Sequence, residues 1–118
     1  MPRNVLRSPW QFRLVYERGK KVNCKHAVLF YYRPDEARGL GLVGVVASKR
    51  VGGAVQRNRA RRVLREAVRG AAERLVVEGL WVVLVAKKSI LDCSSREVRR
   101  DIEVGLAGAG MIRGSTSD

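Results

Sequence analysis

The basic side chains between Lys49 and Arg69 have the clearest chemical signature in this sequence. The segment holds eight basic residues and a single acid, Glu66. Four of its arginines recur at every fourth position, a spacing that places them in one stripe along a helix: Arg57, Arg61, Arg65 and Arg69. Neighbouring guanidinium groups repel one another, so the stripe predicts a partner with regularly spaced negative charges, such as the phosphates of a nucleic acid. A solvated helix face is the alternative, but such faces usually mix both signs of charge.

The other reactive side chains offer little for catalysis by the protein itself. His26 is the only histidine, and Cys24 and Cys93 are the only cysteines. A structural zinc site needs four nitrogen or sulfur ligands, and a catalytic triad needs a histidine beside a nucleophile. The acids are few and lie mostly on expected helix surfaces, and the sequence shows no carboxylate cluster of the kind that a metal-dependent nuclease needs. We therefore expect no catalytic residue and no metal site in the chain.

Length and composition indicate one compact domain with a basic surface. The chain has 118 residues, a formal net charge of +13 and a hydrophobic content of 46%. That content is sufficient for a core, so disorder over the whole chain is not expected. We find no signal-peptide pattern and no apolar run long enough to cross a membrane, and we therefore expect a soluble protein of the cytoplasm.

Hydrophobic periodicity and capping motifs predict the elements that position the basic stripe. Ser8 and Gln11 form a capping box around Pro9, and Ser94 and Glu97 form a second one. The expected helices cover about 9–18, 55–77 and 95–107. The expected strands cover 27–32, 40–47 and 80–86, with a short one around 20–25. The apolar residues of the middle helix all fall on one face, which predicts that this face is buried.

The order α-β-β-β-α-β-α indicates an α+β fold, with helices packed on a small mixed sheet of about four strands. We expect residues 1–118 to form a single domain, with flexible ends over 1–7 and 108–118. Gly39 to Gly44 match G-x-G-x-x-G, but the motif lies within a strand pattern and does not open a helix. We interpret these as strand glycines that allow another part of the chain to approach closely.

The aromatic residues leave two interpretations open. Alternation along the strand 27–32 places Phe30 and Tyr32 on one face of the sheet and Tyr31 on the other. One face must form the core. A ring on the other face, or at the seam between sheet and helix, could stack on an unpaired base.

The segment from Ser48 to Glu66 resembles the signature of the bacterial ribonuclease P protein subunit, S-K-[KR]-x-G-x-A-x-x-R-N-[RK]-x-[KR]-R-x-x-R-[EQ]. Fixed Gly, Ala, Asn and basic positions coincide over this whole motif, which makes the resemblance specific. Gly53 stands where some members have Asn or Lys, at a position that tolerates change. The first helix also resembles that of the family, with Phe12, Val15, Tyr16 and Gly19 at matching spacings, and about residues 8–107 are covered.

The resemblance implies a function and a set of site residues. In this family a catalytic RNA, with Mg²⁺ held mainly by that RNA, cuts the 5′ leader from precursor tRNA, and the protein assists binding and cleavage. The implied partners are the catalytic RNA and precursor tRNA, with one protein per RNA and no membrane. The implied contacts to the catalytic RNA are Lys49, Arg50, Arg57, Asn58, Arg59 and Arg62. The implied cleft for the single-stranded leader is lined by Phe12, Tyr16, Phe30, Arg61 and Arg65.

Other classes of protein share some of these features. A ribosomal or other structural RNA-binding protein would have similar charge and size, but it need not have the R-N-R pattern. A DNA-binding protein would need a helix free to enter a groove. The middle helix has an apolar face that we expect to be buried, which argues against that interpretation.

Overall fold

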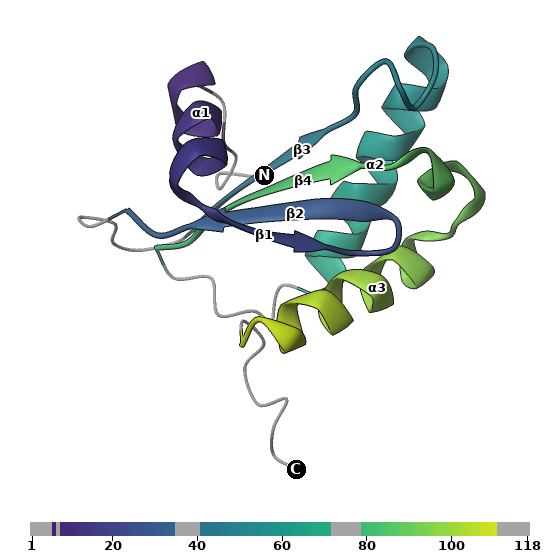
Figure 1. The fold of residues 1–118 in the computed structure, drawn as a ribbon. Coiled ribbons are helices and arrows are strands. Elements are labelled where there is room, and N and C mark those ends of the chain that lie inside the picture. Colours follow the sequence, from purple (N-terminus) through teal and green to yellow (C-terminus); the bar gives the residue numbers. More distant parts are fainter. Residues whose placement is uncertain (1–5, 7, 35–40, 72–78, 111–118) are drawn as a thin grey trace.

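The computed structural model describes residues 6, 8–34, 41–71 and 79–110. In this part of the chain, the helices and strands follow one another in the predicted order α-β-β-β-α-β-α (Figure 1). The helices are α1 (Pro9–Arg18), α2 (Ala54–Ala71) and α3 (Ser95–Gly108), with a short 3-10 helix, η2 (Lys88–Asp92). The strands are β1 (Lys20–Asn23), β2 (Ala27–Tyr32), β3 (Leu42–Val46) and β4 (Trp81–Ala86).

The four strands form one mixed sheet in the order β1-β2-β4-β3. Strands β1 and β2, and likewise β2 and β4, are antiparallel, whereas β3 and β4 are parallel. Strand β4 therefore lies inside the sheet, with Leu84 opposite Leu29 on one side and Val45 on the other. This position explains its unbroken apolar sequence, because a central strand covered on both faces is buried all round.

Helices cover both faces of the sheet. Figure 1 shows α1 on one face and α2 with α3 on the other. Alternate residues of β2 follow this division, since Leu29 belongs to the core under α2 and α3 while Phe30 packs in the smaller core under α1. Tyr32 lies on the same face as Phe30, and Tyr31 lies on the face of Leu29, which confirms the predicted alternation.

The predicted helix starts are confirmed by their caps. The backbone N–H of Ser8 donates to Gln11 Oε1 at 3.2 Å, and α1 begins at the next residue, Pro9. At α3 the capping box is complete, because Ser94 N–H donates to Glu97 Oε1 at 2.8 Å and Glu97 N–H donates to Ser94 Oγ at 3.2 Å. These hydrogen bonds satisfy amides that the first turn of a helix leaves unpaired.

Some boundaries differ from the prediction. The sequence did not predict η2, whose residue Ile90 is buried in the larger core. The expected continuation of the middle helix to 77 lies outside the described residues beyond Ala71, as do most of the expected flexible ends. Leu6 belongs to the expected flexible end 1–7, yet its side chain is only 3% exposed and its N–H donates to Val43 O at 3.1 Å.

Candidate RNA-binding site

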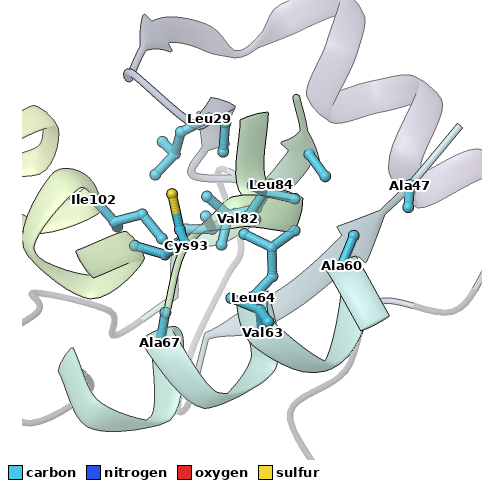
Figure 2. Close-up of a cluster of buried hydrophobic side chains, with 14 of the residues drawn as sticks. Leu29, Ala47, Ala60, Val63, Leu64, Ala67, Val82, Leu84, Cys93 and Ile102 are labelled. Atoms are coloured by element: carbon cyan, nitrogen blue, oxygen red, sulfur yellow. The ribbon is translucent and has the colours of Figure 1, made fainter. Parts of the chain in front are cut away.

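Helix α2 has an apolar face and, on its other side, a basic face, as the sequence predicts. Figure 2 shows Ala60, Leu64 and Ala67 beneath Val82 and Leu84 of the sheet. The opposite face of the helix is open to solvent, and with the loop before the helix it exposes six basic side chains. We call these six residues the basic surface: Lys49, Arg50, Arg59, Arg62, Arg65 and Arg69.

The loop between β3 and α2 holds two of these cations in place. Val51 N–H donates to Ser48 O at 3.0 Å, and the Val51 side chain is 1% exposed within the larger core. Arg50 N–H donates to Ser48 Oγ at 3.3 Å. The turn is therefore fixed from inside by Val51, while Lys49 and Arg50 stay exposed at its surface.

Arg57 of the predicted RNA-contact set and Arg61 of the predicted cleft set make hydrogen bonds within the start of α2 and the loop before it. Arg57 is partly buried, and its Nη1 donates to Gly52 O at 3.2 Å. Gly52 has φ +147°, a conformation that favours glycine. Arg61 Nη2 donates to Asn58 Oδ1 at 2.5 Å. Arg57 and Arg61 thus shape the surface that the other cations present, and their guanidinium groups are less free to meet phosphate than those of the basic surface.

A groove of about 560 Å³ lies between α1 and the sheet. It is lined by Pro9, Phe12, Arg13, Tyr16 and Glu17 of α1 and by Val46 of β3. We call it the α1 groove. Lys49 follows Val46 by only three residues, which span at most about 11 Å, so the α1 groove and the basic surface adjoin at the end of β3.

The three predicted cleft rings lie together, but not in equivalent positions. Tyr16 is 42% exposed, and its ring meets that of Phe30 edge to face, with centroids 5.0 Å apart. Partial burial raises the pKa of the Tyr16 hydroxyl. Phe12 and Phe30 are partly buried and pack against the small core of Leu6, Val15 and Val83. Tyr16 is therefore the ring most open to a ligand, and the two phenylalanines support it.

The structure does not place Arg61 and Arg65 beside these rings. Both lie on α2, which packs on the opposite face of the sheet from α1. That all five residues line one cleft stays a prediction. Periodicity shows that a helix face is buried, but not against which face of the sheet. The cation that does line the α1 groove is Arg13. Its position four residues after Pro9 and three before Tyr16 was the available signal, since such residues share a helix face.

The histidine and the cysteines lie in a separate cluster near η2. His26 Nδ1 is 2.8 Å from Ser89 Oγ, and its Nε2 is 3.4 Å from Cys93 Sγ. Cys24 and Cys93 are buried free thiols. Among the residues that the structure describes, no three His, Cys, Asp or Glu side chains are grouped so that they could hold a metal ion.

The fold and these surfaces define a small basic α+β protein that binds nucleic acid. No helix in the described part of the chain is long and apolar enough to span a membrane. A family model described as Ribonuclease P matches residues 1–110. The chain therefore belongs to the ribonuclease P protein family, as the motif from Ser48 to Glu66 indicated. As a member of this family it is a protein subunit of ribonuclease P, an endoribonuclease of tRNA processing in which the RNA subunit performs the chemistry.

Individual relatives support this assignment. The ribonuclease P protein component of Symbiobacterium thermophilum is 36% identical over 108 residues, which cover 92% of each chain. That of Chloroflexus aurantiacus is 37% identical over 113 residues, covering 96% of this chain and 82% of the relative. The solved RNase P protein of Staphylococcus aureus has the same fold, with a TM-score of 0.78 and 20% identity over 95% of this chain and all of the other.

Proposed function

We propose that the basic surface binds the catalytic RNA of ribonuclease P and that the α1 groove binds the unpaired 5′ leader of precursor tRNA. The observation that supports this division most strongly is the placement of the two surfaces. Cations on α2 and its preceding loop occupy one side of the sheet, and an exposed tyrosine in a groove occupies the other. A duplex or folded RNA needs the first kind of surface, and a single strand with exposed bases needs the second.

The basic surface can act by releasing counterions. Each phosphate that a cation neutralises frees condensed ions from the RNA, which favours binding at low salt. Asn58 lies between the cations at the start of α2, and its Oδ1 is occupied by Arg61. Asn58 is exposed, so its amide N–H groups can still donate to an RNA acceptor. We propose this role for the predicted contact set, with one protein per RNA and with Mg²⁺ held mainly by the RNA.

The α1 groove can hold leaders of different sequence. A base stacks on an aromatic ring whatever its identity, and each such stack contributes about 1–3 kcal/mol. Tyr16 offers the ring, and Arg13 offers a charge for a neighbouring phosphate. Binding of this kind is suited to an enzyme whose substrates differ in their leaders. Because precursor tRNA is made in the cytoplasm, we also propose that the protein works there.

A cleavage assay tests this proposal. Precursor tRNA is incubated with a bacterial ribonuclease P RNA, with and without the protein, at several Mg²⁺ concentrations. We expect the protein to lower the Mg²⁺ requirement or to tighten substrate binding, and we expect no cleavage by the protein alone. Magnesium-dependent cleavage at the 5′ site by RNA-free protein would contradict the assignment of chemistry to the RNA.

The groove is tested by Tyr16→Ala, with Val104→Ala as a matched control. Val104 is 68% exposed on α3, a helix that contributes no residue to either proposed surface. Loss of one stack predicts that Tyr16→Ala weakens binding of leader-containing precursor by about 5-fold or more. Binding of mature tRNA and the melting temperature should change little, and Val104→Ala should change neither. An equal loss with and without the leader would show that the groove does not hold it.

A further inference from the structure

The described residues expose two large aromatic side chains, and both belong to α1. One is Tyr16 in the α1 groove, and the other is Trp10, which is 56% exposed. Trp10 meets Trp81 of β4 edge to face, with ring centroids 5.8 Å apart. Trp81 in turn meets Tyr32 of β2 at 6.5 Å. The two inner rings pack against the small core under α1, so a row of three rings leads from that core to the surface and ends at Trp10.

The position of Trp10 is fixed before any ligand binds. It is the second residue of α1, and Pro9 at the first position restricts the backbone there. The hydrogen bond from Ser8 N–H to Gln11 Oε1 closes the same turn. The edge contact with Trp81 then limits the indole itself. A preorganised ring loses little conformational freedom on binding, which favours its use as a stacking surface.

Trp10 is next to the α1 groove but around the helix from it. Pro9 and Arg13, which line the groove, are its neighbours at one and three residues on α1. A strand that left the groove past the start of α1 would pass Arg13, which lines the groove, and then Trp10, three residues before it in the chain. Surfaces that bind single-stranded nucleic acid combine cations for the phosphates with exposed aromatic rings for the bases in this way.

We propose that Trp10 is a second stacking site, which takes an unpaired leader base farther from the tRNA than the bases held in the α1 groove. Arg13 lies between the two sites and neutralises a phosphate of the connecting nucleotides. The net charge of +13 favours a nucleic acid over a second copy of this chain as the occupant. The inference rests on the proposed function of the groove. The competing interpretation is that Trp10 only covers the edge of the core at Trp81.

The test uses the reconstituted holoenzyme and a series of precursor tRNAs whose leaders increase in length. For the wild type, affinity should rise in two steps, as the leader first fills the groove and then reaches Trp10. Trp10→Ala should remove the second step, a loss of about 5-fold or more for long leaders, and keep the first. Trp10→Phe should keep most of both. Val104→Ala serves again as the exposed control.

A spectroscopic measurement keeps the proposal testable if Trp10→Ala is poorly folded. Trp81→Phe leaves Trp10 as the only indole of the chain, and its fluorescence should change with long leaders but not with short ones. Two results would overturn the inference: a full second step in Trp10→Ala, or an equal loss of affinity for the catalytic RNA alone, which would place that RNA on the ring. If the wild type shows no dependence on leader length, the groove proposal itself fails.

Discussion

Replacing Gly44 with alanine should disturb both the packing of α1 and the groove beside it. Gly44 lies in β3, and a Cβ there would be 2.7 Å from Cε1 and Cζ of Phe12 and 3.2 Å from Cβ of Leu6. The first distance is too short for any contact, so the Phe12 ring must move. Since Phe12 packs against the core and lines the groove, a new position of its ring changes the packing at both. Overpacking of this kind costs about 1–3 kcal/mol.

Denaturant unfolding measures this cost, and Gly108→Ala is the matched control. A Cβ on Gly108 meets nothing within 4 Å, so alanine at this helical position should raise the unfolding free energy by up to ~1 kcal/mol. Gly44→Ala should lower it by about 1–3 kcal/mol. It should also weaken binding of leader-containing precursor more than binding of the catalytic RNA, because the basic surface lies across the sheet.

A second substitution tests the cause. Phe12→Leu in the Gly44→Ala background removes the ring that clashes, so part of the missing stability should return. The two changes would then be non-additive, as expected for residues in contact. Unchanged stability and unchanged leader affinity in Gly44→Ala would refute the reasoning from this contact.

Three further predictions concern the basic surface, Asp101 and Cys24. Arg59→Ala and Arg62→Ala should each reduce the slope of log affinity for the catalytic RNA against log salt by about 0.7–0.9 for every phosphate that is no longer neutralised, with the circular dichroism spectrum unchanged; an unaltered slope in both would remove them from the interface. Asp101 accepts backbone N–H groups of the β1–β2 turn at 2.9 and 2.7 Å, so Asp101→Ala should lower the unfolding free energy by about 1.5–3 kcal/mol in urea titrations. Burial raises the pKa of the Cys24 thiol to about 11. The unfolded chain therefore loses this proton first, and stability should fall between about pH 9 and 11, with a smaller fall in Cys24→Ala.

Local features of this chain were predictable because local interactions determine them. The helix beginning at Pro9 follows from the hydrogen bond between Ser8 and Gln11, and the helix beginning at Ser95 follows from the box at Ser94. Both involve residues three apart in sequence. The buried face of α2 and the alternation along β2 are likewise periodicities of a single element. Such patterns show which face of an element is buried, but not which other element covers it.

The relation between elements could not be read in the same way. Nothing in the spacing of Arg61 and Phe30 shows that α2 and the Phe30 side chain lie on opposite faces of the sheet. That depends on which face each helix covers. The role of Gly44 was only partly visible, since the sequence indicated a close approach but not that Phe12 makes it. The short helix η2 lacks a periodic pattern, and Ile90 is fixed by the core around it.

The position of the sheet between the two surfaces has a consequence for how two RNAs can be held at once. Leader and catalytic RNA are both polyanions and repel each other. On the proposed assignment, the α1 groove and the basic surface lie on opposite faces, so the two RNAs stay apart over most of the sheet. They come together only where Val46 ends β3 and Lys49 and Arg50 follow. Exposed cations at that junction reduce the repulsion where it is greatest. Lys49 and Arg50 should therefore contribute most to affinity when leader and catalytic RNA are bound together.

Alanine at both Lys49 and Arg50 should weaken binding of long-leader precursor in the holoenzyme more than binding of the catalytic RNA alone. Equal losses in the two measurements would show that these cations contact one RNA only.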